Sequence, residues 1–249
     1  MDDMPRALDE ALLKDLECPV CMEYMVPPIK MCKNGHNICS KCRGKVTFCP
    51  TCRAEFLETR NVIMENIVRR QKYPCANRQS GCLDLFSIEH IAEHNAGCLY
   101  GKIKCPSLPF KGCSWNGLKK DLKEHVKAAH PKAFTEVSTF SDSYISGSWA
   151  FVSCFGELFT YYKQIRNGRY YAAVRLVGTR SEASKYKCEF TLSAANGIEQ
   201  ISNTFLVRGY SEDFETIFKS RKCFNLHEET AKIFAVDEDL NMFVKLSTV

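Results

Sequence analysis

The cysteines constrain the fold of this chain more than any other residue type. Twelve of its 15 cysteines lie between Cys18 and Cys113, and the other three follow Pro131. A segment so dense in cysteine, and so poor in long apolar runs, is typical of small modules held together by metal ions. The part after Pro131 is long enough to bury a core of its own. We therefore predict a domain boundary near Pro131.

The first eight candidate ligands come in pairs. Along the chain they are Cys18 and Cys21, Cys32 and His36, Cys39 and Cys42, and Cys49 and Cys52. Zinc prefers four thiolate or imidazole ligands in a tetrahedron, so eight ligands predict two zinc sites. The spacing alone does not decide whether the pairs alternate between the sites or fill them in sequence.

This order, with seven cysteines and a histidine in fourth place, resembles the RING finger family. The resemblance implies a cross-brace, in which alternate pairs share a zinc ion. One ion would be held by Cys18, Cys21, Cys39 and Cys42, and the other by Cys32, His36, Cys49 and Cys52. All seven thiols would then be metal ligands, and none is expected to act as a nucleophile.

The same resemblance gives roles to three further residues. Val20 in the first knuckle and Pro50 in the last would contact a ubiquitin-conjugating enzyme, while Arg53 would hydrogen-bond both that enzyme and ubiquitin. A guanidinium can donate to two partners at once, and holding a reactive thioester in one orientation speeds its reaction. Two alternatives remain: Arg53 is only a solvated charge, or the RING-like fold serves only as a scaffold.

An internal repeat follows this segment. Two cysteines, eleven residues and a histidine-led pair occur twice, as Cys75, Cys82, His94 and Cys98 and again as Cys105, Cys113, His125 and His130. Each set predicts a tetrahedral zinc site. Gly81 and Gly112 precede the second cysteine, where a tight knuckle requires a positive φ. The repeat aligns His94 with His125, which leaves His90 as a surface or packing residue.

Two helices are predicted to flank the RING segment. Apolar residues recur at helical spacing in both, as Leu8, Leu12, Leu13 and Leu16 before it and as Val62, Ile63, Ile67 and Val68 after it. We expect both apolar faces to pack against neighbouring modules.

Beyond about residue 133 the pattern changes to the two-residue period of strands. Apolar and polar residues alternate over residues 170–177, 187–192 and 242–247. Asn167-Gly168 and Asn196-Gly197 each predict a hairpin turn. Several short strands at this spacing favour an antiparallel sandwich.

No catalytic constellation occurs in this half of the sequence. Cys154, Cys188 and Cys223 lack the spacing of metal ligands and are predicted to be packing thiols. His227 stands alone, and a short helix is predicted at residues 211–220. These features predict a binding module.

The charge balance bears on nucleic acid as a partner. The formal net charge is +5, and twelve thiolates on four zinc ions would bring it to about +1. Residues 87–94 are acidic where base-reading fingers carry Arg, Asn or Gln. We therefore expect no nucleic acid partner, although recognition through residues 75–130 is kept as an alternative.

The sequence also bears on the compartment. No apolar run approaches the ~20 residues needed to cross a bilayer, and the first 15 residues lack the apolar core of a signal peptide. We expect a cytoplasmic protein that also reaches the nucleus, with no membrane partner. In such reducing compartments cysteines serve metal sites rather than disulfides.

Taken in order, the RING segment, two fingers and sandwich resemble the seven in absentia homolog (Siah) family of RING-type E3 ubiquitin-protein ligases. The matching stretches are LECPVC (16–21), CPTCR (49–53), RNVIME (60–65), SCFG (153–156) and VGTR (177–180). The implied fold is α+β and multidomain: a helical lead-in (1–17), the RING (18–53), a helical linker (54–72), tandem zinc fingers (73–131, as 75–98 and 105–130) and a TRAF-like antiparallel β-sandwich (132–249).

The resemblance also implies partners. A ubiquitin-conjugating enzyme and ubiquitin would meet at the RING, and the sandwich would form a homodimer and take a substrate or adaptor peptide against a sheet edge. Substrates would then be degraded by the proteasome. One departure affects the peptide groove: the family's groove tryptophan aligns with Ser148, and Trp149 is one position along. A one-residue slip moves a side chain to the other face of a sheet.

The sequence thus predicts a ubiquitin ligase with four zinc ions and no covalent catalytic residue. A non-catalytic signalling adaptor of the same architecture is the first alternative, and a zinc-finger nucleic-acid-binding protein is the second.

Overall fold

The computed structural model describes residues 10–107, 112–142, 147–194, 196–236, 239–240 and 242–249. The chain forms two compact units, Met1–Cys98 and Leu99–Val249. The division thus falls between the two predicted fingers, whereas the cysteine content placed a boundary near Pro131. The reason is packing, because Ile88 and Ile91 of the first finger join the RING core and Leu122 of the second joins the sandwich. Within the described residues, no helix has both the length and the apolar character needed to span a membrane.

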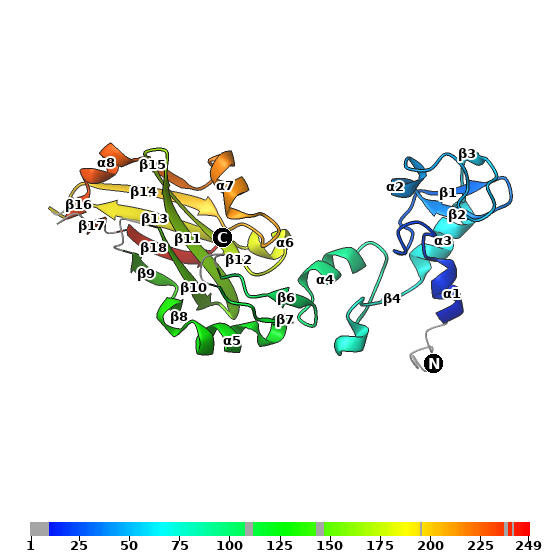
Figure 1. The fold of residues 1–249 in the computed structure, drawn as a ribbon, viewed down its shortest axis with the longest axis horizontal. Helices are drawn as coiled ribbons and strands as arrows, with labels where there is room; N and C mark the ends of the chain where they lie inside the picture. The colour runs from blue at the N-terminus through cyan, green and yellow to red at the C-terminus, as the bar shows by residue number, and fades with distance from the viewer. Residues whose placement is uncertain (1–9, 108–111, 143–146, 195, 237–238, 241) are drawn as a thin grey trace. The chain divides into compact units, whose positions relative to one another are not determined.

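The first unit is built around a small antiparallel sheet of order β2-β1-β3 (Figure 1). Its elements are α1 (Glu10–Asp15), β1 (Ile29–Cys32), β2 (Asn37–Cys39), α2 (Ser40–Arg43), β3 (Phe56–Arg60), α3 (Val62–Arg70), β4 (Tyr73–Pro74), η1 (Arg78–Ser80), β5 (Leu85–Phe86) and α4 (Ile91–Gly97). With strands this short, the zinc ligands Cys18, Cys32 and Cys42 are themselves part of the buried core.

The lead-in helix α1 is packed as predicted over its described part. Leu13 and Leu16 are buried in the RING core, and Leu12 packs beside them. Leu8 lies outside the described residues.

Helix α3 forms where it was predicted but packs through a different face. Asn61 caps it, because the Asn61 side chain accepts a hydrogen bond from Met64 N. Val68 is buried and Ile67 packs against the core, but Val62 and Ile63 are 56% and 75% exposed. The prediction that all four apolar residues pack was therefore wrong. Glu65 takes the inward position, and its side chain is fully buried.

The second unit carries the second finger and the sandwich. Its elements are β6 (Lys102–Lys104), β7 (Asn116–Leu118), η3 (Lys119–Asp121), α5 (Leu122–Ala129), η4 (Pro131–Ala133), β8 (Phe134–Thr135), β9 (Thr139–Asp142), β10 (Ser148–Cys154), β11 (Glu157–Arg166), β12 (Arg169–Leu176), α6 (Arg180–Ala183), β13 (Tyr186–Ser193), β14 (Gln200–Leu206), α7 (Phe214–Ser220), β15 (Phe224–His227), α8 (Glu228–Lys232), β16 (Ala235–Val236), β17 (Asp239–Leu240) and β18 (Met242–Thr248).

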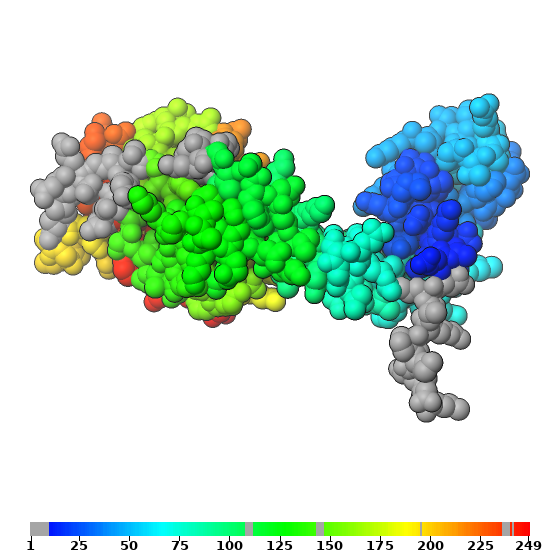
Figure 2. Space-filling view, turned by 60° about the horizontal axis from the view of Figure 1, so that its bottom comes forward, coloured from blue at the N-terminus to red at the C-terminus, as the bar shows by residue number. Residues whose placement is uncertain are grey.

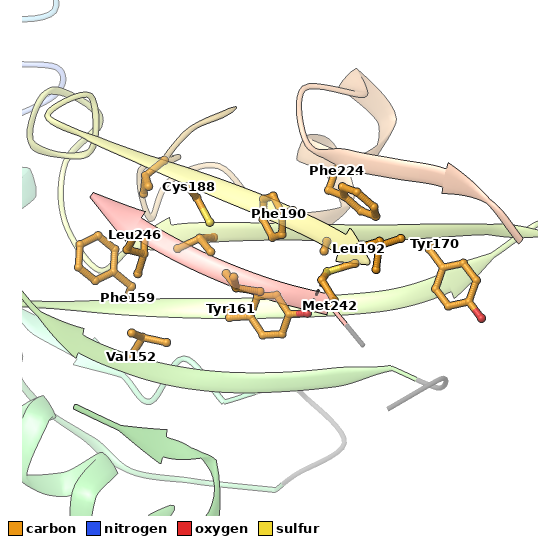
Figure 3. Packing of buried hydrophobic residues seen from close by; sticks show 14 of the residues in the cluster. Val152, Phe159, Tyr161, Tyr170, Cys188, Phe190, Leu192, Phe224, Met242 and Leu246 are labelled. Atoms are coloured by element: carbon orange, nitrogen blue, oxygen red, sulfur yellow. Dashed lines mark hydrogen bonds between the residues drawn. The ribbon is translucent and has the colours of Figure 1, made fainter. Parts of the chain in front are cut away.

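Two sheets form the predicted sandwich. One has the order β15-β12-β11-β10-β8 and the other the order β14-β13-β18-β9. Alternate residues of both sheets point into one shared core, where Tyr161 and Phe159 of the first sheet face Phe190 and Leu246 of the second (Figure 3). The period-two pattern in the sequence reflects this arrangement.

Both predicted hairpins are present. Asn167 and Gly168 join β11 to β12 with φ values of +50° and +68°, the left-handed conformation that a two-residue turn requires. Asn196 and Gly197 lie between β13 and β14, and Ala194 N donates to Glu199 O at 2.9 Å. Register across the turn is therefore set locally.

The outer face of the five-stranded sheet is covered at two places. Helix α7 packs Phe214 and Phe218 on Ala173 of β12, and the second finger covers Phe151 and Leu158. In Figure 2 the green segment that carries α5 forms one continuous surface with the sandwich. Strand β12 is consequently buried on both faces along most of its length. Helix α7 begins at Phe214 rather than near Ser211, because Asp213 caps it.

Candidate metal centres and the surface they support

The described residues contain four clusters of Cys and His side chains, and in each the ligand atoms all lie within 4.8 Å of one another. In the RING segment, alternate pairs share a cluster, which decides the question that spacing left open. One cluster is Cys18, Cys21, Cys39 and Cys42, and the next is Cys32, His36, Cys49 and Cys52. The fingers supply Cys75, Cys82, His94 and Cys98, and then Cys105, Cys113, His125 and His130.

The distances within the clusters fit tetrahedral zinc. With Zn–S bonds of about 2.3 Å and Zn–N bonds of about 2.0 Å, two sulfurs lie about 3.8 Å apart and a sulfur and a nitrogen about 3.5 Å apart. Cys32 Sγ lies 3.7 Å from Cys52 Sγ and 3.5 Å from His36 Nδ1. These sulfurs are also too far apart for a disulfide, whose bond is about 2.05 Å.

The finger clusters have the same dimensions. Cys82 Sγ lies 3.4 Å from His94 Nε2, and Cys113 Sγ lies 3.3 Å from His125 Nε2. His90 is exposed and outside the cluster, where its Nδ1 pairs with Ser87 Oγ at 2.9 Å. The zinc expected from sequence therefore fits all four donor sets.

Without a metal the thiols of these clusters ionise unequally: burial disfavours the Cys18 thiolate, but backbone hydrogen bonds together lower the pKa of Cys18 to about 7. Burial raises the pKa of the Cys39 and Cys82 thiols to about 12, so both would be protonated at neutral pH without a metal. Thiolate is the form that binds zinc, and a divalent cation at the centre of each cluster would remove the proton. Zinc in these sites would supply structure rather than chemistry, since all four ligands come from protein.

Each finger places an aromatic ring against its ligand histidine. Phe86 stacks on His94 with ring centroids 3.9 Å apart, and Trp115 stacks on His125 at 4.5 Å with 7° between the planes. Gly117 makes room for this indole, because a Cβ there would lie 2.5 Å from a Trp115 ring atom. The sequence carried a signal for this, since an aromatic residue follows the second cysteine in both repeats.

Both knuckle glycines behave as predicted. Gly81 has a φ of +110° and Gly112 a φ of +63°. A residue with a Cβ rarely adopts these angles. The prediction from the repeat is confirmed at both positions.

Trp149 belongs to the support of the fourth cluster. It lies on the outer face of β10, edge-on to the ligand His130 at a centroid distance of 5.6 Å. Ser148 points the other way and donates to Asp142, which also pairs with the buried Lys163. Because the tryptophan lies at position 149 rather than 148, its side chain is on the outer face of the sheet, where it packs against the second finger.

Three exposed residues lie beside the RING ligands. Val20 is 38% exposed, and Pro50 and Arg53 are exposed as well. Two apolar residues that sequence reasoning overlooked join them: Met22 and Phe48, each adjacent to a ligand, expose 68% and 54%. Cross-braced zinc ions therefore hold apolar side chains and a guanidinium in water, an arrangement suited to binding another protein.

A cross-braced RING, two zinc fingers and an antiparallel sandwich define a multidomain RING protein. Family models match the chain in the same order: E3 ubiquitin-protein ligase sina/sinah RING finger at residues 18–52, Sina zinc finger at 66–141 and Sina TRAF-like domain at 152–245. These three matches fall on the RING segment, the two fingers and the sandwich.

Curated relatives agree with these matches. The chain is 30% identical over 246 residues to E3 ubiquitin-protein ligase sina of Schistosoma mansoni. This match covers 94% of this chain and 65% of that relative. It is 30% identical to the probable E3 ubiquitin-protein ligase sinah of Drosophila melanogaster, in a match that covers 98% of this chain and 72% of that relative. It is 31% identical to E3 ubiquitin-protein ligase siah-1 of Caenorhabditis briggsae, in a match that covers 96% of this chain and 58% of that relative. The chain belongs to the sina family of E3 ubiquitin-protein ligases.

Proposed function

We propose that this chain is a RING-type E3 ubiquitin-protein ligase. The observation that carries the proposal is the alternate pairing of ligands in the two RING clusters, with Val20, Pro50 and Arg53 exposed beside them. The RING recruits a ubiquitin-conjugating enzyme charged with ubiquitin and holds the thioester in a reactive orientation. The attacking lysine belongs to the substrate, and no cysteine of this chain forms a covalent intermediate.

The RING residues divide the work. Val20 and Pro50 offer apolar contact to the conjugating enzyme, and Arg53 bridges that enzyme and ubiquitin with its several N–H groups. Met22 and Phe48 extend the apolar contact. Zinc, when bound, fixes the backbone that carries these side chains and takes no part in the transfer itself.

The sandwich holds the substrate or adaptor. An extended peptide adds to the edge of one of the two sheets, so that a bound substrate becomes polyubiquitinated and is sent to the proteasome. With Trp149 committed to the second finger, the peptide preference of this chain differs from that of relatives with tryptophan one position earlier. The edge can be identified by comparing the proteins captured by the full chain with those captured by a variant substituted at one sheet edge. Loss of captured proteins from the variant identifies that edge as the binding site.

A reconstitution separates the ligase from a non-catalytic adaptor. The full chain is combined with activating enzyme, ubiquitin, ATP and a broad panel of conjugating enzymes. Ubiquitin chains that depend on this protein support the ligase. An absence of chains with every conjugating enzyme, from protein that retains its zinc, leaves the adaptor.

Two further properties complete the proposal. The chain forms a homodimer through the sandwich, and light scattering of the purified protein should give twice the mass of 28.4 kDa. It works in the cytoplasm and the nucleus, because thiols held as metal ligands persist in reducing compartments. Fractionation of cells that express the tagged chain tests the compartment.

A further inference from the structure

Arg53 has an unusual backbone conformation for a residue with a side chain. Its φ is +59°, in the left-handed region that L-residues rarely adopt. Its own N–H donates to Cys49 O at 2.8 Å, which closes the knuckle around the second zinc site. A strained residue of this kind keeps its conformation only where its surroundings hold it.

The neighbouring loop between Cys32 and His36 provides that support on both sides of Arg53. Before Arg53, the Asn34 side-chain amide donates to Cys52 Sγ at 3.4 Å. After it, Lys33 N donates to Glu55 O at 3.0 Å, and the Lys33 ammonium pairs with the Glu55 carboxylate. This loop therefore holds Cys52 and Glu55, which lie on either side of the exposed Arg53 in the sequence.

Of these contacts, the hydrogen bond from Asn34 to Cys52 is the one that a side-chain substitution can remove with a measurable effect. The Lys33–Glu55 backbone bond survives any side-chain change, and an ion pair between exposed side chains contributes little. A zinc-bound thiolate sulfur keeps lone pairs that the metal bond does not use, and an amide N–H that donates to one of them holds the sulfur from a second direction. Because Cys52 immediately precedes Arg53, fixing Cys52 also fixes the direction in which Arg53 leaves the zinc site.

We propose that Asn34 is a positioning residue for ubiquitin transfer, which acts on Arg53 through Cys52. The proposal rests on the proposed ligase function. Asn34 touches neither ubiquitin nor the conjugating enzyme in this scheme. Its removal should slow transfer without weakening either the binding of the conjugating enzyme or the retention of zinc.

A double-mutant cycle with Arg53 tests this relation in the full chain. The assay is single-turnover discharge of ubiquitin to free lysine from a conjugating enzyme that the wild type uses. Asn34→Ala should lower the rate at saturating conjugating enzyme about three- to ten-fold, with the half-saturating concentration unchanged. In an Arg53→Ala background the same substitution should have no further effect, because residues that act in series are not additive.

A matched control is available in the first finger. Asn77 also donates its side-chain amide to a ligand sulfur, Cys75 Sγ, at 3.8 Å, but Cys75 belongs to the first-finger cluster and not to the RING. Asn77→Ala should leave the discharge rate at the wild-type value. Asn34→Ser retains a donor and should recover part of the rate lost in Asn34→Ala.

Three outcomes would overturn the proposal: an unchanged rate in Asn34→Ala, rate losses that multiply with those of Arg53→Ala, or loss of zinc from Asn34→Ala, which would make Asn34 a metal-retention residue. A measurement without activity decides the matter even if the wild type transfers no ubiquitin and the proposed function itself fails. The ¹⁵N order parameter of the Arg53 amide should fall from about 0.85 in the wild type to below about 0.6 in Asn34→Ala. An unchanged order parameter contradicts the proposal.

Discussion

Ile29 N donates a 2.9 Å hydrogen bond to Glu65 Oε1. Ile29 begins the first strand of the RING, and Glu65 lies on the helix that follows the RING. The same carboxylate accepts from Arg60 at 3.0 Å and lies 3.8 Å from Arg69. A fully buried carboxylate therefore fixes this helix to the sheet, together with the apolar contacts of Ile67 and Val68.

Replacing Glu65 with alanine should destabilise the first unit by about 2–3 kcal/mol. The substitution leaves the buried Ile29 N–H without an acceptor and removes two hydrogen bonds from Arg60. Denaturant unfolding of the zinc-loaded chain, followed by a probe in the RING, measures the change. Glu58→Ala on the exposed end of β3 is the control and should cost less than about 0.5 kcal/mol. Equal effects at the two positions would contradict the role of Glu65.

The same carboxylate predicts a pH dependence. Its hydrogen bonds from Arg60 hold the pKa of Glu65 below its usual value. A lowered folded-state pKa gives stability that is present above the unfolded pKa of about 4.3 and is lost as pH falls through the folded value. The unfolding free-energy difference between the wild type and Glu65→Gln should thus be constant from about pH 6 to 8 and narrow below about pH 4.3. Using the difference cancels the release of zinc in acid, and a difference that does not narrow would rule out this linkage.

Metal content tests all four clusters together. Elemental analysis of the full chain should give four zinc ions, and Cys75→Ser should lose the ion of the first finger. Only two ions per chain would mean that the fingers do not bind zinc.

Chelation should affect the two units differently. The RING and first finger should unfold, because their zinc ligands form part of their core. The sandwich should persist, as its own core is separate, but loss of the second finger should uncover Phe151 and Leu158. An increase in binding of a dye for apolar surface, with strand circular dichroism retained, measures this step. Complete loss of the strand signal would contradict it.

The stacked indole predicts an effect on metal affinity. Trp115→Ala should weaken zinc binding at the fourth cluster about ten-fold, because residues that orient a ligand histidine tune its affinity. Gly117→Ala should act in the same direction by displacing the ring. Competition with a chromophoric chelator measures both, and Phe155→Ala, an exposed aromatic in the β10–β11 turn, serves as control. An affinity unchanged by Trp115→Ala would show that the stacking is incidental.

Sequence alone could predict the parts of this structure that depend on local spacing. A few neighbouring residues are enough to define a ligand pair, a knuckle glycine or an Asn-Gly hairpin, so these features could be predicted from the sequence. The packing of the second finger on the sandwich was not, because it joins Leu122 to Phe151 across two modules. The inward face of helix α3 was predicted wrongly for a related reason. Periodicity depends only on apolar residues, whereas the burial of the Glu65 carboxylate depends on its hydrogen-bond partners Ile29 and Arg60.

The candidate site divides in the same way. The residues that bind zinc were evident from their type and order. Those that support the ligands from distant positions in the sequence, such as Asn34 beside Cys52 and Trp149 beside His130, carried little signal. The surface beside the RING was predicted only through family resemblance, since Val20 and Pro50 have no feature of their own that marks them as a contact.

The most direct test of the whole account is the rate at which the zinc-loaded chain releases ubiquitin from a charged conjugating enzyme. We predict that the wild type accelerates release to free lysine, that Arg53→Ala reduces this acceleration at least ten-fold (~1.4 kcal/mol of orientation free energy), and that both proteins retain four zinc ions and the same unfolding midpoint. Equal rates with and without the wild-type chain, for every conjugating enzyme tried, would contradict the account.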